Sequence, residues 1–338
     1  MKAVGYRANG PIDRADALLD LVVPAPEPGP RDLLVEVRAI SVNPVDAKVR
    51  RNAAPPPGEA RILGYDAAGV VRAVGRDVTL FAPGDEVWYA GDIGRPGTNA
   101  EWHAVDERIV GRKPASLSFA DAAALPLTAI TAWELLFDRL QAPRDGGAGE
   151  AILVVGAGGG VGSILVQLAR RLTGLTVIGT ASRAGTREWV RDLGAHHIID
   201  HAQPLQPQLD AIGVPQVRYV ASLTHTDAHY DALVHALAPQ GRLGLIDDPA
   251  TPLDVMKLKG KALSLHWELM FTRPMHRTPD MIEQHRLLDA VADLVDAGTL
   301  RATTGEHLGR IDAANLRRAH ALIESGRTRG KLVLEGFA

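Results

Sequence analysis

The sequence feature that most constrains this chain is an apolar run followed at once by a cluster of glycines, in residues 151–170. The run Ala151-Ile-Leu-Val-Val155 has no polar alternation, which indicates a strand buried on both faces, as in a parallel sheet. The glycines predict a tight turn, and apolar residues at helical spacing from Val161 to Leu172 predict a helix. The backbone N–H groups at such a helix start can bind an anion. We therefore expect a dinucleotide pyrophosphate to contact Gly158, Gly159, Gly160, Val161 and Gly162.

The spacing Ala157-x-Gly159-x-x-Gly162 departs from the usual dinucleotide fingerprint, because an alanine stands at its first glycine. A glycine-rich structural turn or a mobile loop has a similar composition. The strand before the glycines and the helix after them favour the nucleotide-binding interpretation.

Length and composition limit the classes of protein. A chain of 338 residues suits two domains, and its net charge of −3 gives no electrostatic case for nucleic acid. We find no apolar run as long as a membrane span, and the N-terminus leads directly into a strand with no signal peptide, so we expect a cytoplasmic protein. Cysteine is absent, which excludes disulfides, thiolate catalysis and thiolate zinc sites.

The order of patterns along the chain predicts an α/β fold with two parts. Up to about residue 125 the segments are short and β-like, separated by Pro and Gly clusters, and indicate a partly open β-barrel. Strands and helices then alternate, which predicts a doubly wound parallel sheet. The predicted strands are 151–155, 175–180, 196–199, 217–221, 242–246 and 262–266, with helices that include 186–193 and 227–237.

Beyond residue 269 the alternation stops. Helices are predicted at 279–297 and 312–325, and a last strand at 331–335 is expected to return to the barrel. The barrel domain then comprises residues 1–127 and 270–338, and the Rossmann domain residues 128–269.

The end of the second strand predicts which cofactor is bound. In this fold an acidic residue there accepts hydrogen bonds from the ribose 2′-hydroxyl, whereas a cation and hydroxyls suit a 2′-phosphate. Ser182 lies 20 residues past Gly162, Arg183 follows it, and no Asp or Glu is near. An arginine at a helix start is also a common solvated residue. Sequence and position together favour NADPH over NADH.

The ends of the later strands should border the cofactor as well, because ligands lie outside the carboxyl ends of such sheets. This position alone makes Leu223, Ile246 and Trp267 candidate cofactor contacts, although ordinary loops also end strands.

With these elements placed, the chain resembles the medium-chain dehydrogenase/reductase superfamily over essentially its whole length, on the quinone-oxidoreductase side and in a branch called zinc-type alcohol dehydrogenase-like. The matching segments are 41–46, 63–71, 83–87, 125–132, 156–162, 264–270 and 325–331. The resemblance implies a GroES-like substrate domain, a Rossmann domain, an active site between them, NADPH-dependent reduction and a homodimer.

The zinc ligands of related dehydrogenases are missing from this sequence. By the resemblance their positions are Asn43, Tyr65 and roughly Leu127, and none of these is a good zinc ligand. His225 and His229 are four residues apart with Asp227 between them, as ligands on one helical face would be. Because no third ligand accompanies them, a surface helix start explains them better. We expect no metal.

The resemblance also implies roles for single residues. Relatives use the Asn of an Asn-Pro motif near the nicotinamide, which is Asn43 here, although Asn before Pro is also a common turn residue. Where many relatives have a Tyr, this chain has Lys48, so Lys48, Tyr65 and water are all open as the proton donor, and Tyr65 equally suits the barrel core.

Three further residues match cofactor contacts of the family or lie near them. Thr131 corresponds to a residue on the nicotinamide side, and His201 stands where relatives often have a Tyr beside the adenosine phosphate. Lys331 either reaches the cofactor or is solvated.

These observations predict hydride transfer from NADPH to a quinone or to the β-carbon of an α,β-unsaturated carbonyl, without zinc. We expect the substrate between Asn43, Tyr65, Trp88 and residues 267–271. Two alternatives remain open: an alcohol dehydrogenase with no metal or an unusual zinc site, and a non-catalytic NADPH-binding sensor or structural protein.

Overall fold

The computed structural model describes residues 1–337, which divide into two compact units. Unit 1 comprises residues 1–130 together with the stretch from residue 271 onward, and unit 2 comprises residues 131–270. The sequence places these boundaries at 127/128 and 269/270. The first change of unit falls within one helix, α3 (Pro126–Trp133).

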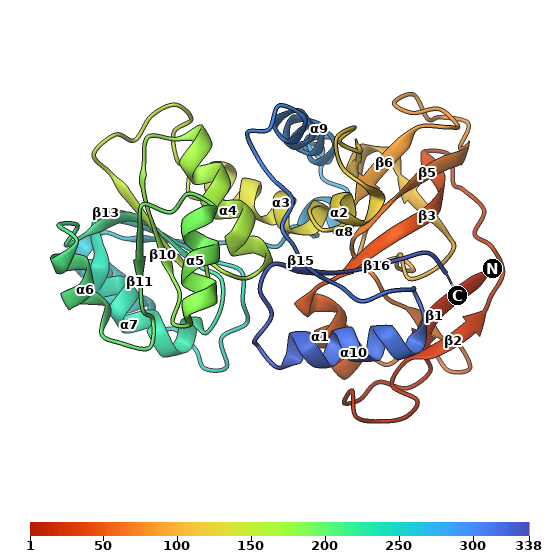
Figure 1. Ribbon diagram of the computed structural model, residues 1–338, viewed down its shortest axis with the longest axis horizontal. Helices are drawn as coiled ribbons and strands as arrows, with labels where there is room; N and C mark the ends of the chain where they lie inside the picture. The colour runs from red at the N-terminus through yellow and green to blue at the C-terminus, as the bar shows by residue number, and fades with distance from the viewer. Residues whose placement is uncertain (338) are drawn as a thin grey trace. The chain divides into compact units, whose positions relative to one another are not determined.

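Unit 2 contains a six-stranded sheet in the order β11-β10-β9-β12-β13-β14, in which every neighbouring pair is parallel. This order confirms the predicted doubly wound α/β fold (Figure 1). Its strands are β9 (Ala151–Val155), β10 (Thr176–Thr180), β11 (His197–Ile199), β12 (Val217–Ser222), β13 (Leu237–Leu245) and β14 (Ser264–Trp267). Its helices are the π-helix η2 (Glu134–Arg139), α4 (Gly160–Leu172), α5 (Ala184–Asp192), α6 (Leu205–Ala211), α7 (Thr226–Ala236) and the 3₁₀-helix η3 (Val255–Lys261).

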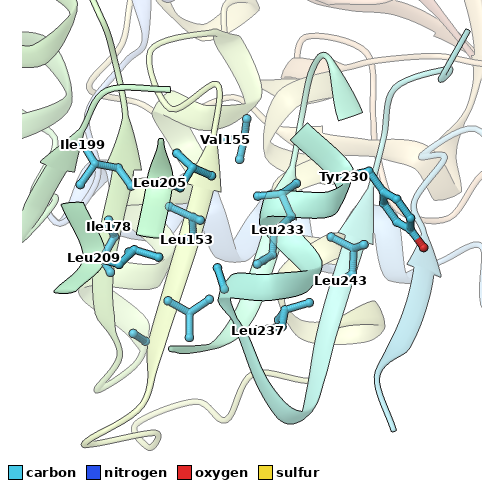
Figure 2. Close-up of a cluster of buried hydrophobic side chains, with 14 of the residues drawn as sticks. Leu153, Val155, Ile178, Ile199, Leu205, Leu209, Tyr230, Leu233, Leu237 and Leu243 are labelled. Atoms are coloured by element: carbon cyan, nitrogen blue, oxygen red, sulfur yellow. The ribbon is translucent and has the colours of Figure 1, made fainter. Parts of the chain in front are cut away.

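The sheet of unit 2 is buried on both faces, as the uninterrupted apolar run of β9 predicts. Leu153 and Val155 of β9 belong to a cluster that includes Ile178 of β10, Leu209 of α6 and Leu233 of α7 (Figure 2). Ile152 and Val154, which alternate with them along the strand and so point to the opposite face, are also fully buried. Helices therefore cover both faces, and the carboxyl ends of the parallel strands lie at one edge of the sheet.

Unit 1 contains a seven-stranded sheet in the order β15-β16-β3-β5-β6-β8, with β7 also paired to β3, and a three-stranded sheet in the order β2-β1-β4. Its strands are β1 (Lys2–Tyr6), β2 (Leu19–Val22), β3 (Asp32–Val42), β4 (Arg61–Ile62), β5 (Ala67–Val74), β6 (Glu86–Tyr89), β7 (Trp102–Asp106), β8 (Val110–Arg112), β15 (Thr304–His307) and β16 (Lys331–Glu335). Its helices are α1 (Pro44–Asn52), the 3₁₀-helix η1 (Glu107–Ile109), α2 (Phe119–Ala123), α8 (Thr272–His276), α9 (Glu283–Asp296) and α10 (Ala313–Glu324).

The last strand, β16, pairs antiparallel with β3, which confirms that the chain returns to its N-terminal domain. In Figure 1 the dark blue β16 lies beside the orange β3. This pairing matters for the site, because it brings Lys331 beside the end of β3 although almost 290 residues separate them in the sequence.

Helix α1 is anchored on α10 by a buried cation. Arg50 has no exposed surface and pairs with Glu324 at 2.6 Å, while its Nε donates to Nδ1 of His320 at 3.3 Å. Burial and the nearby guanidinium lower the pKa of His320 to about 3, so its ring is neutral and accepts this bond. The contact fixes the helix that begins directly after Asn43.

Several predicted elements have different limits in the structure; helix α9, for example, begins at Glu283 rather than at 279. Helix α5 starts two residues before the predicted 186, and β13 starts at Leu237 rather than 242, since it continues from the end of α7 without a loop. Helix α6 was not among the helices named from the sequence.

The expectation that no segment has the length and apolarity of a membrane span is wrong for Phe119–Arg139, where α2, α3 and η2 follow one another as a 21-residue helical run. Of its most apolar window, 83% is buried within the chain, as in a core helix of a soluble protein.

Candidate active site

The turn between β9 and α4 has the geometry that its glycines predict. Gly156 has a φ of +81°, which favours glycine, and its N–H donates to Oγ1 of Thr180 at 3.1 Å. A Cβ on Gly162 would lie 2.3 Å from the carbonyl oxygen of Gly156, so only glycine lets helix and turn pack this closely. The start of α4 at Gly159 has no side-chain cap. Its first N–H groups lack acceptors within the helix and fit the pyrophosphate of a dinucleotide.

The end of β10 exposes the two residues predicted to select the cofactor. Ser182 and Arg183 are both exposed, and Arg183 is the N-cap residue of α5. Arg187 in the first turn of α5 donates to the carbonyl oxygens of Ala181 and Ile198 at 3.0 and 3.1 Å, which fixes the backbone on both sides of this pair. The geometry suits a phosphate held by Arg183, and that role stays a prediction.

His201 follows β11 and lies against α7. Its ring centroid is 6.1 Å from that of His229, and its Nδ1 is buried with no hydrogen-bond partner among residues 1–337. Burial, followed by the charges of His201 and His225, lowers the pKa of His229. A polar atom that is buried and unsatisfied is costly, and the contact of His201 with a ligand phosphate stays a prediction.

The other predicted cofactor contacts follow the carboxyl ends of β12, β13 and β14. Leu223 and Ile246 are half-buried, and Trp267 is 51% exposed. The segments that follow β12 and β13 are linked, because Asp247, after β13, accepts hydrogen bonds from the N–H and Oγ1 of Thr226, after β12, at 2.9 and 2.5 Å. Thr131, in the part of α3 that belongs to unit 2, is buried.

A pair of buried carboxyl groups in unit 2 was not expected from the sequence. Glu134, at the start of the π-helix η2, and Glu268, directly after β14, have side chains that are essentially unexposed. Arg139 lies 2.8 Å from Oε2 of Glu268 and 3.9 Å from Oε2 of Glu134. Burial, and then the charge of Glu134 and its hydrogen bond, raise the pKa of Glu268 well above its ordinary value. One guanidinium serves two carboxyls, so the pair retains a proton.

In unit 1 the polar centre is the carboxylate of Asp66, which has no exposed surface. Its Oδ2 accepts hydrogen bonds from Oγ of Ser41 at 2.8 Å, Nδ2 of Asn43 at 2.8 Å and Nζ of Lys331 at 2.9 Å. Its Oδ1 accepts from the backbone N–H of Leu127 at 2.7 Å, in the first turn of α3. Four donors from three separate chain segments thus meet on one carboxylate.

Asn43 is buried, and both ends of its amide are bonded within this network. Its Nδ2 donates to Asp66 and, at 3.4 Å, to the carbonyl oxygen of Tyr65, while its Oδ1 accepts from the ammonium of Lys331. Its backbone N–H donates to Oδ2 of Asp46 at 2.8 Å at the start of α1. These contacts support the alternative role of Asn43 as an organiser of the turn before Pro44. Its direct contact with substrate stays a prediction.

Lys331 is only 3% exposed, so the interpretation of this residue as a solvated lysine is wrong. Its ammonium donates to Asp66, to Asn43 and, at 3.2 Å, to the carbonyl oxygen of Val42. The β16–β3 pairing and the buried carboxylate hold it inside unit 1. An ammonium has three donors, and all three are directed at protein acceptors, which leaves none for a cofactor without a rearrangement.

Tyr65 lies between two buried aspartates in space and sequence. It is 1% exposed, its ring packs edge-on against Phe271 at 5.3 Å, and no group among residues 1–337 accepts a hydrogen bond from its hydroxyl, although the guanidinium of Arg61 is close enough to act against the rise of its pKa. Burial, and then the negative charge of Asp46, raise its pKa well above the ordinary 10.0. The phenol therefore stays protonated at every physiological pH and can act as a hydrogen-bond donor.

Asp46 is the second buried aspartate. It accepts from the N–H groups of Asn43 and Gly64, the latter at 2.9 Å. Burial raises its pKa to about 7, against the effect of these two hydrogen bonds and of Lys331, with a smaller rise from Asp66. Because Gly64 precedes Tyr65, Asp46 fixes the backbone that carries the phenol.

The remaining predicted residues separate into two kinds. Lys48 is exposed on α1, and its role as the proton donor stays a prediction. Trp88 is fully buried in β6, so, like Tyr65, it could contact a substrate only after the packing around it opens, and its place beside the substrate stays a prediction.

The positions matched to zinc ligands hold a bonded amide at Asn43, a protonated phenol at Tyr65 and an aliphatic side chain at Leu127. They do not fit zinc. Among residues 1–337 no three His, Cys, Asp or Glu side chains group as a metal site would.

Two family models match the chain. The model of the alcohol dehydrogenase GroES-like domain matches residues 29–115, within unit 1. The model of the zinc-binding dehydrogenases matches residues 193–334, which include parts of both units.

Individual proteins match over almost the whole chain. A zinc-type alcohol dehydrogenase-like protein of Staphylococcus aureus is 39% identical, with 99% of each chain covered. The solved structure of a provisionally described zinc-dependent alcohol dehydrogenase of Rhizobium etli is 60% identical, with a TM-score of 0.96 over 100% of this chain and 98% of the other. A quinone oxidoreductase of Pseudomonas syringae is 25% identical, with a TM-score of 0.84 over 99% of each chain.

The carboxyl pair of unit 2 predicts a specific pH dependence of stability. The folded protein keeps the proton of Glu268, whereas the unfolded chain releases it above the ordinary pKa of 4.5, so this group lowers the free energy of unfolding as the pH rises from there. We expect Glu268→Gln to remove this loss. The stability of the variant relative to the native protein should rise with pH, by at most about 1.4 kcal/mol per pH unit, in urea unfolding from pH 5 to pH 8.

The control for this experiment is Glu188→Gln on the exposed surface of α5, which should leave the pH profile unchanged. Parallel profiles for Glu268→Gln and the native protein would show that the pair does not retain a proton.

Proposed function

The chain belongs to the medium-chain dehydrogenase/reductase superfamily and is an oxidoreductase, and we propose that it is an NADPH-dependent reductase of the cytoplasm that needs no zinc. The proposed acceptor is a quinone or the β-carbon of an α,β-unsaturated carbonyl. The observation that carries this proposal is the uncapped helix start at Gly159, behind a turn that only glycines allow. The name of the Pseudomonas syringae relative supports a quinone-type acceptor.

The choice of NADPH rests on the surroundings of β10 and β11. Arg183 offers a planar guanidinium to a 2′-phosphate, and no carboxylate stands at Ser182 to accept hydrogen bonds from a 2′-hydroxyl. The unpartnered Nδ1 of His201 offers a further polar contact. We propose that these residues distinguish NADPH from NADH.

When bound, NADPH supplies a hydride. The residues of unit 1 must then stabilise the negative charge that moves to the substrate oxygen as the hydride adds to the β-carbon. Among the predicted candidates in unit 1, Tyr65 has a protonated, unpartnered hydroxyl, whereas the amide of Asn43 is already bonded. We propose that Tyr65 donates its hydrogen bond to this oxygen, that water protonates the α-carbon, and that the phenol keeps its own proton.

A substrate oxygen can reach the hydroxyl of Tyr65 only if the packing around it opens, because that hydroxyl has almost no accessible surface. Phe271 is the aromatic neighbour of Tyr65 in unit 1, and it stands where the chain re-enters this unit. We propose that displacement of Phe271 admits the acceptor. Displacement of the apolar Phe271 ring from the phenol breaks no hydrogen bond, so no hydrogen-bond energy is lost when the packing opens.

We also propose a homodimer. Strand β14 is one edge of the parallel sheet of unit 2, and an edge strand offers unpaired backbone groups to a second copy. Trp267 at its end is 51% exposed and Leu269 beyond it 53% exposed, so this edge carries two large apolar side chains that a second copy could cover.

The role of Tyr65 predicts opposite effects on catalysis and stability. We expect Tyr65→Phe to lower kcat/KM for the best quinone or enone acceptor by roughly 100-fold, because one hydrogen bond to the developing charge is lost. Its stability should be unchanged or higher, since the hydroxyl that is removed has no partner. NADPH oxidation against an acceptor panel and urea unfolding measure the two effects.

The matched control is Tyr89→Phe. Tyr89 is also fully buried, but its hydroxyl pairs with Nδ1 of His103 at 3.2 Å. We expect this variant to lose about 1 kcal/mol of stability and to keep its kcat/KM. If Tyr65→Phe retains full activity, Tyr65 is a core residue and the proposed mechanism is wrong.

The glycine turn predicts a loss of cofactor binding without a loss of stability. A Cβ on Gly159 would approach only the carbonyl oxygen of Gly156, at 3.5 Å, so alanine fits the protein alone. It would, however, place a methyl group where the pyrophosphate lies. We expect Gly159→Ala to weaken NADPH binding at least 10-fold in calorimetry.

We expect Arg183→Ala to weaken the binding of NADPH by about 10-fold and to leave the binding of NADH unchanged.

Gly260→Ala is the control for the turn, because a Cβ there meets no atom within 4 Å and the residue lies in η3. Unchanged NADPH affinity in Gly159→Ala would place the cofactor elsewhere.

The proposed dimer predicts a sedimentation mass of twice the 36.0 kDa of the chain. We expect Leu269→Glu to give a monomer, because it places a carboxylate beside the paired edge. Val22→Glu, at a position 87% exposed in β2 of unit 1, should remain dimeric. A native protein that sediments as a monomer contradicts the proposal.

A further inference from the structure

The backbone around Tyr65 is held by two carboxylates that the proposed reaction does not itself use. Asp46 accepts the N–H of Gly64, on one side of the phenol, and Asp66 follows it on the other side. Asp66 is tied in turn to Ser41, Asn43, Lys331 and the N–H of Leu127. The carbonyl oxygen of Tyr65 itself accepts from Asn43. Every residue of the segment 64–66 therefore has a fixed polar contact, although the hydroxyl of Tyr65 has none.

Gly64 adds a steric constraint to these contacts. Its φ is +112°, and a Cβ at this position would lie 2.5 Å from Oγ1 of Thr98 and 2.7 Å from the backbone nitrogen of Asn99. The N–H of Thr98 donates to the carbonyl oxygen of Gly64 at 3.0 Å, and Oγ1 of Thr98 donates to that of Asp66 at 3.1 Å. The segment that carries the phenol is thus fixed from a second side.

Lys331 supplies the cation of this network. Its ammonium bonds Asp66 and Asn43 together and has no donor left for solvent. A buried ion pair of this kind contributes little net stability, since the cost of removing both charges from water offsets their attraction. Apolar side chains of similar volume would hold β16 against β3 as well. What apolar side chains would not supply is a single orientation for the amide of Asn43 and the carboxylate of Asp66.

We infer that Asp66 and Lys331 are positioning residues for the reaction. They lock Asn43 and the backbone of residues 64–66, so that the phenol of Tyr65 meets the substrate oxygen in one orientation. This inference rests on the proposed function, because it requires Tyr65 to be the donor. It assigns the two residues no contact with substrate and no exchange of protons.

The test is the double variant Asp66→Asn with Lys331→Met, which removes both charges of the pair together. We expect it to fold with a melting temperature near that of the native protein. Its kcat for the best acceptor should fall at least 10-fold, while its Kd for NADPH should change less than 2-fold. A role in stability alone would not separate these two quantities.

A second comparison shows whether the pair acts through the phenol. In the background Tyr65→Phe, adding the double variant should lower kcat no further, because the group that is positioned is already gone. If the factors by which the two changes lower kcat multiply, the pair acts on a group other than the phenol, and the inference is overturned.

The matched control is Asp32→Asn with Arg95→Met. This ion pair lies in the same unit, at the other end of β3, with hydrogen bonds of 2.9 and 2.7 Å. Its removal should leave kcat within 2-fold of the native value, whatever its effect on the melting temperature.

The remaining outcomes are also decisive. A folded double variant with native kcat overturns the inference and leaves the proposed function standing, whereas a native protein that reduces no acceptor overturns the proposed function first. If the double variant does not fold, Lys331→Arg keeps the charge and changes the geometry. A folded Lys331→Arg with reduced kcat supports the inference, and one that has native kcat or does not fold overturns it.

Discussion

The organisation of unit 1 depends on one carboxylate in the interior of the protein. Asp66 has no contact with solvent, and donors from the protein replace the water that its side chain has lost. The donors come from the end of β3, the start of α1, the first turn of α3 and the last strand of the chain. The carboxylate therefore joins segments that are up to 265 residues apart in sequence. The C-terminal strand, which returns to the N-terminal domain, carries the cation of this network.

Unit 2 is organised by a steric constraint rather than by a charge. Its central turn allows no side chain at Gly156 or Gly162, since one has a left-handed backbone and the other would contact the turn itself. The result is a helix start that is left without a side-chain cap, and its first N–H groups have no acceptor within the helix. In unit 1 the hydroxyl of Tyr65 is one of the buried polar groups that have no acceptor in the part of the protein that the structure describes. Both sets of donors, the N–H groups of the helix start and this hydroxyl, suit a ligand that supplies acceptors.

The fold could be predicted from the sequence because its signals are local. The apolar run of β9 and the terminal strand β16 have the limits that their residues predict, and the glycine turn was recognised from its flanks. The buried networks could not be predicted in this way. Asp46, Asp66 and Lys331 carry ordinary surface residue types, and only the antiparallel pairing of β16 with β3 brings them together. The same holds for Glu134 and Glu268, whose carboxyls meet only after the chain has crossed the sheet. For this reason the alternative of a solvated Lys331 was wrong, and the complete burial of Trp88 could not be predicted from its residue type.

The most direct test of the account follows the hydride itself. Chelator-treated protein is incubated with NADPH that carries deuterium at the transferable position and with an α,β-unsaturated ketone, and the product is analysed by mass spectrometry and NMR. The account predicts a saturated ketone with deuterium on the β-carbon. Deuterium on the carbinol carbon of an allylic alcohol, or transfer that appears only after zinc is added, would contradict it.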